Sequence, residues 1–107
     1  PSCVILAAEV DCETAGLIVG YILKRWDSRG PMLFLYSIDV VEKHRRRGVA
    51  RGLIQEFLRM GKEAGCCSSF VFTNESNSPA IRMYEDAGGT RANPDDVMFA
   101  WEIRREE

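Results

Sequence analysis

The hydrophobic pattern of this chain changes its period near residue 47, and no other feature restricts the possible folds as much. Residues 4–10, 15–26 and 32–41 are apolar and rich in β-branched or aromatic side chains, which is typical of strands. From residue 47 to 64 the apolar side chains recur at helical spacing, and Gly65 provides a helix stop. The sequence therefore predicts an antiparallel meander of three strands that leads directly into a helix.

The second half of the chain predicts three further elements. Residues 67–73 indicate a strand, and a helix follows with Ser78 as N-cap, Pro79 at its first position and its end at Ala87 before Gly88-Gly89. Residues 97–104 alternate like a half-buried last strand, with one set of side chains formed by Val97, Phe99, Trp101 and Ile103. The predicted order β-β-β-α-β-α-β gives a mixed α/β (α+β) fold. Because residues 32–41 are apolar nearly throughout, we expect a central strand covered on both faces.

Length and composition indicate one domain and argue against several functions. A chain of 107 residues has the size of a single domain, which we assign to residues 1–107. The net charge of −2 and the pI near 5.5 argue against nucleic-acid binding. No apolar run reaches the roughly 18 residues of a membrane span, and we see no secretory signal, so we expect a cytoplasmic protein without a membrane partner.

The cysteines and the single histidine do not follow a metal-binding pattern. Cys3, Cys12 and the pair Cys66-Cys67 contain no Cys-x-x-Cys spacing, and His44 is the one histidine of the chain. We therefore expect no metal, and free thiols in a reducing compartment.

Residues 38–52, IDVVEKHRRRGVARG, combine a strand, a basic turn and the start of a helix. The free amides at a helix start bind anions, Gly48 lets a ligand approach the backbone, and Ala50 keeps the next turn small. Four side chains add charge suited to phosphates: Arg45, Arg46, Arg47 and Arg51. An ordinary solvated turn before an amphipathic helix accounts for this stretch equally well.

The second predicted helix carries two candidate functional residues. The phenol of Tyr84 has an ordinary pKa of about 10 and could protonate a departing thiolate, although a core tyrosine is the commoner role. Asn77 precedes the helix, where it could equally be a plain turn or capping residue.

Together these segments resemble the GNAT superfamily of N-acetyltransferases. Arg45-x-x-Gly48-x-Ala50, set between a strand and a helix, is similar to the family signature Gln/Arg-x-x-Gly-x-Gly/Ala. The later Asn77-x-x-Ala80-x-x-x-Tyr84 is similar to the second cofactor motif of the family. The resemblance extends from the first hairpin to the last strand and implies a mainly antiparallel sheet. It is greatest to the aminoglycoside 3-N-acetyltransferases.

The resemblance implies that acetyl-CoA is the co-substrate and that no metal takes part. The pyrophosphate would lie on the amides from Arg46 to Arg51, and the pantetheine would pair with residues 38–40, whose amides would polarise the thioester carbonyl. Tyr84 would protonate the thiolate of coenzyme A. The implied cofactor-binding residues are Ile38, Val40, Arg45, Arg46, Arg47, Gly48, Val49, Ala50, Arg51 and Asn77.

The implied reaction transfers an acetyl group to a primary amine of a small cationic acceptor, with aminoglycosides as one such class. A non-catalytic or protein-directed acyl-CoA-binding module is the alternative, because the chain departs from the family pattern. We expect it to begin after the strand and two helices that usually help to form the acceptor site. Tyr36 is followed by Ser37 where the aminoglycoside enzymes have an aspartate, and Gly88-Gly89 lacks the aromatic residue of the family's glycine–aromatic pair.

These departures leave the general base open. Residues two apart in a strand share a face, so Asp39 should lie on the same side as Ser37 and is one candidate. Glu75, after the fourth predicted strand, is another, and a chain of water molecules is a third.

The missing front elements also predict self-association. A sheet normally needs cover on both faces, so we expect a homodimer with either the exposed sheet face or the last strand at the contact. Met98, Phe99 and Trp101 on that strand would supply apolar area.

Overall fold

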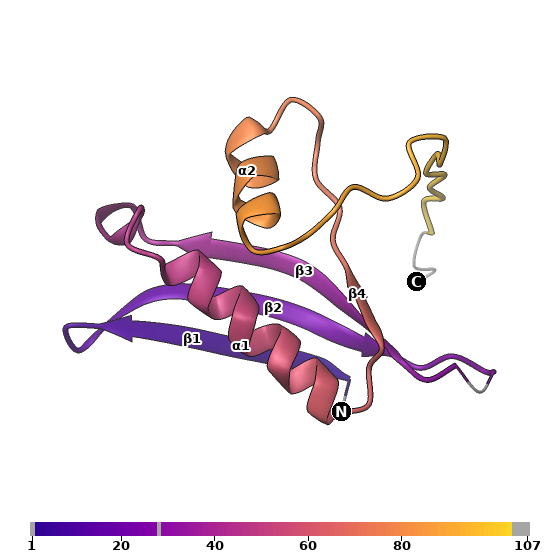
Figure 1. Cartoon of the computed structure of the whole chain (residues 1–107), viewed down its shortest axis with the longest axis horizontal. Coiled ribbons are helices and arrows are strands. Elements are labelled where there is room, and N and C mark those ends of the chain that lie inside the picture. The colour runs from indigo at the N-terminus through magenta and orange to yellow at the C-terminus, as the bar shows by residue number, and fades with distance from the viewer. Residues whose placement is uncertain (1, 28, 104–107) are drawn as a thin grey trace.

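The computed structural model describes residues 2–27 and 29–103 and contains one four-stranded sheet with the order β1-β2-β3-β4 (Figure 1). β1 (Cys3–Val10), β2 (Glu13–Leu23) and β3 (Met32–Val40) form an antiparallel meander, and β4 (Ser68–Phe70) pairs in parallel with β3. A 3₁₀ turn, η1 (Glu42–His44), connects β3 to α1 (Val49–Glu63), and α2 (Ser78–Asp86) follows β4. The predicted meander followed by a helix is confirmed.

The helix α1 covers one face of the sheet and forms the core with it. Phe57 of α1 is fully buried against Ile18 and Leu33 of the strands. Gly20 makes this contact possible, because a Cβ atom at that position would overlap the Phe57 ring. The amphipathic pattern of the helix thus matches its place over the sheet.

The opposite face of the sheet is open. Partners across β2 and β3 place Val19 beside Ser37 and Leu17 beside Asp39 on this face. Ring contacts join five aromatic side chains on the open side or next to it, from Tyr21, Phe34, Tyr36, Phe70 and Phe72. The prediction that the third strand is covered on both faces is therefore wrong for the described residues: its continuous apolar character reflects α1 on one side and aromatic packing on the other.

A β-bulge in β3 determines which residues reach the open face. Gly20 pairs with Leu35 and Val19 pairs with Ser37, so Tyr36 is an extra residue in the ladder. Leu35 is buried on the α1 side before the bulge, and Ile38 packs against the core after it. The bulge therefore shifts the alternation by one residue near the end of the strand.

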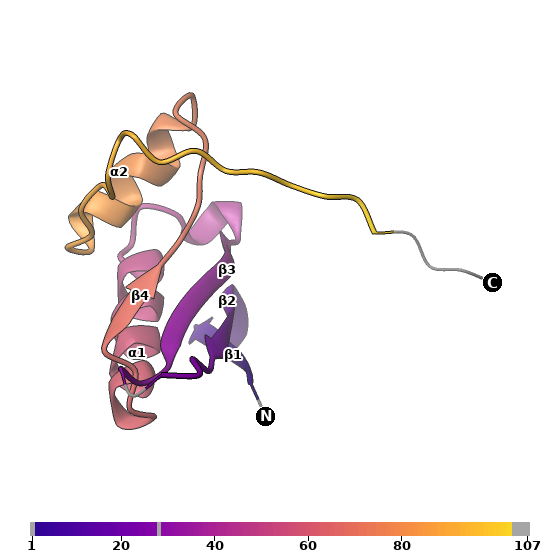
Figure 2. The same cartoon turned by 90° about the vertical axis from the view of Figure 1, so that its right-hand side faces the viewer.

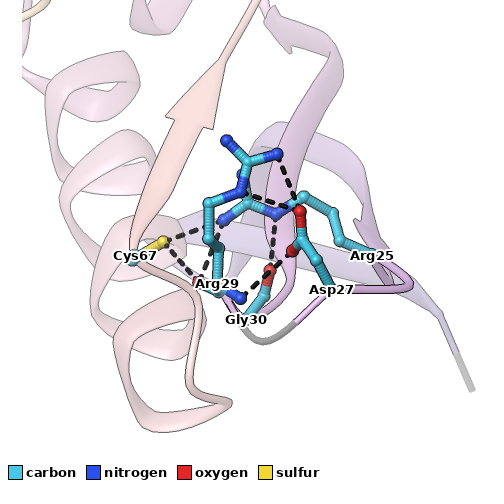
Figure 3. Close-up of polar contacts among 5 residues, drawn as sticks. All are labelled: Arg25, Asp27, Arg29, Gly30 and Cys67. Atoms are coloured by element: carbon cyan, nitrogen blue, oxygen red, sulfur yellow. Dashed lines mark hydrogen bonds and ion pairs between the residues drawn. The ribbon is translucent and has the colours of Figure 1, made fainter.

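A polar network ties the β2–β3 connection to the start of β4 (Figure 3). Arg25 Nε donates to Gly30 O at 2.7 Å, and Arg25 Nη2 donates to Arg29 O at 3.0 Å. Cys67 Sγ donates to the same Arg29 carbonyl at 3.3 Å, and Asp27 pairs with the Arg29 side chain. Because Cys67 directly precedes β4, the network fixes the end of the sheet where β3 and β4 pair.

Three sequence expectations need correction. The fourth strand is shorter than predicted, since only Ser68–Phe70 pairs before the chain turns toward α2. Asn77 rather than Ser78 is the N-cap of α2, and Pro79 lies at the second helical position.

None of the described helices has the length and apolar character to cross a membrane.

The predicted last strand is also wrong over residues 97–103, while Arg104 lies outside the described residues. This segment carries no strand or helix and runs away from the sheet (Figure 2). Trp101, for example, is 82% exposed. Alternating side chains form a strand only where an edge is available, and β4 offers just three paired residues.

Candidate functional site

The outer edge of β3 presents backbone donors that the sheet does not use. Val41 N donates to Ala15 O at 2.8 Å, and bonded pairs alternate along an antiparallel ladder. The amides of Ile38 and Val40 therefore point away from β2. β4 pairs with β3 only at residues 32–34, so among the described residues no strand covers the edge from 35 to 40. An extended ligand could pair with this edge as an additional strand would.

The helix α1 begins directly after this edge with a set of unused amides. Its first internal bond joins Gly52 N to Gly48 O at 3.0 Å, and no side chain caps the start. The amides of the first turn, from Val49 to Arg51, are therefore available to an anion. Gly48 has φ of 80°, and a Cβ atom there would meet no protein atom within 4 Å. The glycine thus supplies the required left-handed conformation and leaves space above the turn.

The turn before Gly48 is strained and is held from both sides. Arg46 has φ of 64°, a conformation that costs a non-glycine residue roughly 1–3 kcal/mol. On one side Arg45 Nε donates to Val40 O at 3.0 Å and anchors the turn to the end of β3. On the other side Arg47 Nη1 donates to His44 Nδ1 at 3.1 Å.

Among the described residues, no ion pair neutralises the positive charge of this turn. Within residues 2–27 and 29–103, no carboxylate forms an ion pair with any of the four arginines at the start of α1, namely Arg45, Arg46, Arg47 and Arg51. The first turn of α1 contains no acidic residue either. These charges add to the positive end of the helix dipole, so the junction is suited to a phosphate or pyrophosphate group.

The second helix positions a tyrosine whose hydroxyl is free to act as a donor. Tyr84 is half-buried against the core, and this burial raises the pKa of its phenol above the ordinary value. No hydrogen bond joins its hydroxyl to another of the described residues. Asn77 Oδ1 accepts from Ala80 N at 3.2 Å, so its side-chain oxygen caps α2.

The two acidic candidates for a general base lie in different surroundings. Asp39 is exposed on the open face, on the same side as Ser37, as the strand alternation predicts. Glu75 is also exposed, but Arg91 donates to both of its oxygens at 2.9 and 3.1 Å, and this hydrogen bonding lowers the pKa of the carboxyl. A carboxylate held in this way is a weaker base, so the geometry favours Asp39 over Glu75.

The structure therefore brings most of the predicted cofactor residues together. Ile38, Val40 and the segment from Arg45 to Arg51 form one continuous strand–turn–helix junction. Asn77 and Tyr84 come from the start and the later part of α2. The chain reaches α2 after it leaves the sheet at the end of β4 (Figure 1). Asp39 lies on the sheet face opposite α1.

The chain matches a known protein family. The family model described as acetyltransferase (GNAT) family matches residues 1–88, which include both the strand–turn–helix junction and α2. The chain belongs to the GNAT acetyltransferase family.

Two curated relatives and one solved structure illustrate the similarity. The mycothiol acetyltransferase of Thermobispora bispora is 29% identical over 81% of this chain and 31% of that protein. The N-alpha-acetyltransferase of Sulfurisphaera tokodaii is 33% identical over 77% of this chain and 56% of that protein. A crystal structure of an aminoglycoside acetyltransferase from an uncultured soil metagenomic sample is 28% identical, with a TM-score of 0.86 over 96% of this chain and 67% of that chain. The chain thus spans about a third to just over half of these curated relatives.

The junction fits the co-substrate of this family. GNAT acetyltransferases use acetyl-CoA, which combines a pyrophosphate with an extended pantetheine arm. The amides of α1, the free space above Gly48 and the uncompensated arginines suit the pyrophosphate. The outward amides of Ile38 and Val40 suit the extended arm and its thioester carbonyl.

Two residues beside this junction were not predicted as functional from the sequence. His44 is the one buried polar residue among those described, at 3% exposure, and it contacts Glu13 at the start of β2. A lone histidine beside three arginines gives no signal by itself. To recognise the His44–Glu13 contact, one would have to know that the turn between β1 and β2 lies against the loop after β3.

Proposed function

We propose that this protein is a cytoplasmic, acetyl-CoA-dependent N-acetyltransferase that acetylates a primary amine of a small cationic acceptor, with aminoglycosides as the first acceptors to test. The observation that carries the proposal is the continuity of the site. The amides of Ile38 and Val40, which suit an extended arm, are followed after one short turn by the free amides from Val49 to Arg51, which suit a pyrophosphate. An anion-binding helix start alone would be far less specific.

The edge of β3 is the candidate oxyanion site. Attack of an amine on a thioester gives a tetrahedral oxyanion, and fixed backbone donors stabilise it because they need no reorganisation. The amides of Ile38 and Val40 are fixed by the ladder with β2. Removal of one such donor typically lowers turnover by about 100- to 1,000-fold.

Tyr84 is the proposed general acid, and Asp39 the proposed general base. The Tyr84 phenol is protonated at neutral pH, as a proton donor to the leaving thiolate must be, and burial raises its pKa further above the ordinary value. Asp39 on the open face could attract a cationic amine and accept its proton, directly or through water. Exposed aromatic side chains near it, such as Tyr36, could contribute cation–π contacts to the acceptor.

A second candidate function is acetylation of a protein or peptide amine, or acyl-CoA binding without catalysis. The 33% identity to an N-alpha-acetyltransferase favours the protein-directed version. The open aromatic face would suit either a small acceptor or a peptide. The two functions share the proposed cofactor site and differ only in turnover and acceptor.

The test measures binding and turnover separately. Calorimetry with coenzyme A should show binding, and Gly48→Glu should abolish it, because the new carboxylate would point into the space above the turn and repel the pyrophosphate. A Cβ atom at this position would meet no protein atom within 4 Å, but a φ of 80° costs a non-glycine residue roughly 1–3 kcal/mol, so urea unfolding must show that the variant is still folded. Release of coenzyme A thiol with a panel of aminoglycosides, polyamines and peptides then identifies the acceptor. Undiminished binding by Gly48→Glu would contradict the proposed phosphate site.

We further propose that the protein acts as a homodimer. The open face and the C-terminal segment expose many large apolar side chains, including Ile5, Leu17, Phe72, Phe99 and Trp101. Light scattering at micromolar concentration should give twice the mass of the chain. Leu17→Glu should split the dimer if the sheet face forms the contact, and Trp101→Glu should split it if the last segment does. A monomer of 12.1 kDa that unfolds cooperatively would refute this proposal.

A further inference from the structure

The imidazole of His44 connects two parts of the fold that are far apart in the sequence. His44 Nε2 donates to Glu13 Oε1 at 3.0 Å, and His44 Nδ1 accepts from Arg47 Nη1 at 3.1 Å. Glu13 also pairs with Lys43. A chain of polar contacts therefore runs from the first residue of β2, through a buried ring, to the residue before Gly48.

The hydrogen-bond partners of the ring assign its tautomer. A guanidinium has only donors and a carboxylate only acceptors, so Nδ1 must carry a lone pair and Nε2 a hydrogen. Glu13 is ionised at neutral pH and is therefore an acceptor only, and hydrogen bonds from Lys43 and from His44 lower its pKa further. The neutral Nε2–H tautomer is the form that satisfies both neighbours.

The position of this chain of contacts gives it a specific consequence for the turn. Arg46 is the strained residue, and the residues on either side of it are each held by a hydrogen bond. Arg45 bonds to the end of β3, and Arg47 bonds to His44; we call these two hydrogen bonds the clamps of the turn. Without the second clamp, Arg46 could relax to an ordinary backbone conformation. The direction of the amides that follow it would then change.

We propose that His44 is a positioning residue that holds the 45–48 turn in its pyrophosphate-binding conformation through Arg47, with Glu13 orienting the ring. The inference rests on the proposed acetyl-CoA site. It assigns His44 no contact with the co-substrate. Its effect should appear in affinity for the phosphate-bearing part of coenzyme A and be absent from affinity for the pantetheine part.

The first experiment compares His44→Phe with His44→Gln by calorimetry. His44→Phe fills the same space without either hydrogen bond and should weaken coenzyme A binding by about tenfold, while binding of pantetheine, which lacks the pyrophosphate, should not change. His44→Gln keeps a donor and an acceptor and should restore most of the affinity. Equal loss of coenzyme A and pantetheine affinity would overturn the proposal, because it would indicate general loss of structure.

A second experiment avoids the buried position, since His44→Phe could fail to fold. Arg47→Met removes the clamp from its exposed end, and Arg51→Met removes an equal charge from the first turn of α1 without breaking a hydrogen bond to a described residue. Coenzyme A should bind about tenfold more weakly to Arg47→Met than to Arg51→Met. Equal affinities would overturn the proposal. If the wild-type protein does not bind coenzyme A, the proposed function fails, and the role assigned to His44 fails with it. If the wild type binds and the paired variants do not differ, only the role assigned to His44 fails.

Discussion

The two helices of this protein differ in how they meet the sheet. Four residues of α1 are buried, Leu53, Ile54, Phe57 and Gly61, whereas no residue of α2 is buried. α1 lies along the covered face of the sheet, and α2 lies farther out, where β4 leaves β3 (Figures 1 and 2).

Because of this difference, the two parts of the proposed site should differ in local stability. The anion site lies at the start of a helix whose middle residues pack in the core, so the core anchors one side of the site. The proposed acid lies on a helix with few buried contacts, which should open more readily. Mutations of the buried residues of α1 should therefore change folding, whereas a mutation of Tyr84 on α2 should change catalysis with little effect on folding.

The largest effect expected from α2 alone is on turnover. Tyr84→Phe should lower acetyl transfer by about two to four orders of magnitude, because the proton donor to the thiolate is lost. Since burial raises the pKa of Tyr84 above 10.0, the wild-type enzyme should lose this donor only in more alkaline solution. Initial rates across pH with saturating acetyl-CoA check both points, and urea unfolding should give nearly equal stability. Equal turnover in the variant would make Tyr84 a core residue only.

The largest effect expected on folding belongs to α1. Phe57→Ala should lower the free energy of unfolding by about 3–5 kcal/mol, because it leaves a cavity between α1 and the strands. Met83→Ala on α2 is the matched control and should cost clearly less, since Met83 is only partly buried. Urea unfolding of the two variants measures the difference. Similar losses in both would mean that α2 is as much a part of the core as α1.

The same contrast explains which features the sequence could predict. The meander, α1 and the basic turn follow from local periodicity and from glycine and arginine at fixed positions, and all three are present. Residues 97–103 have equally good alternation, but pairing depends on an edge that no local pattern describes. Likewise, Ser78 and Asn77 are both good capping residues, and only the bond to Ala80 decides between them.

The candidate site follows the same division. The junction from Ile38 to Arg51 is contiguous, so its motif predicts its geometry. The contact of His44 with Glu13 joins residues 31 positions apart, and the bulge at Tyr36 depends on the pairing of β2 with β3. Both require the tertiary fold, and the bulge also decides that the face shared by Ser37 and Asp39 is the open one.

The smallest effect concerns the cap of α2, where one residue has two assigned roles. Asn77→Ala should lower the free energy of unfolding by about 1 kcal/mol, because the amide of Ala80 loses its acceptor. Asn77→Asp keeps an acceptor near the positive end of the helix and should retain the stability of the wild type. The aspartate lacks the side-chain amide donor and carries a negative charge, so coenzyme A should bind several-fold more weakly if Asn77 also contacts it, as the family motif implies. Urea unfolding and calorimetry on the same two variants separate these roles. Full affinity in Asn77→Asp would restrict Asn77 to capping, and α2 would then contribute only Tyr84 to the proposed site.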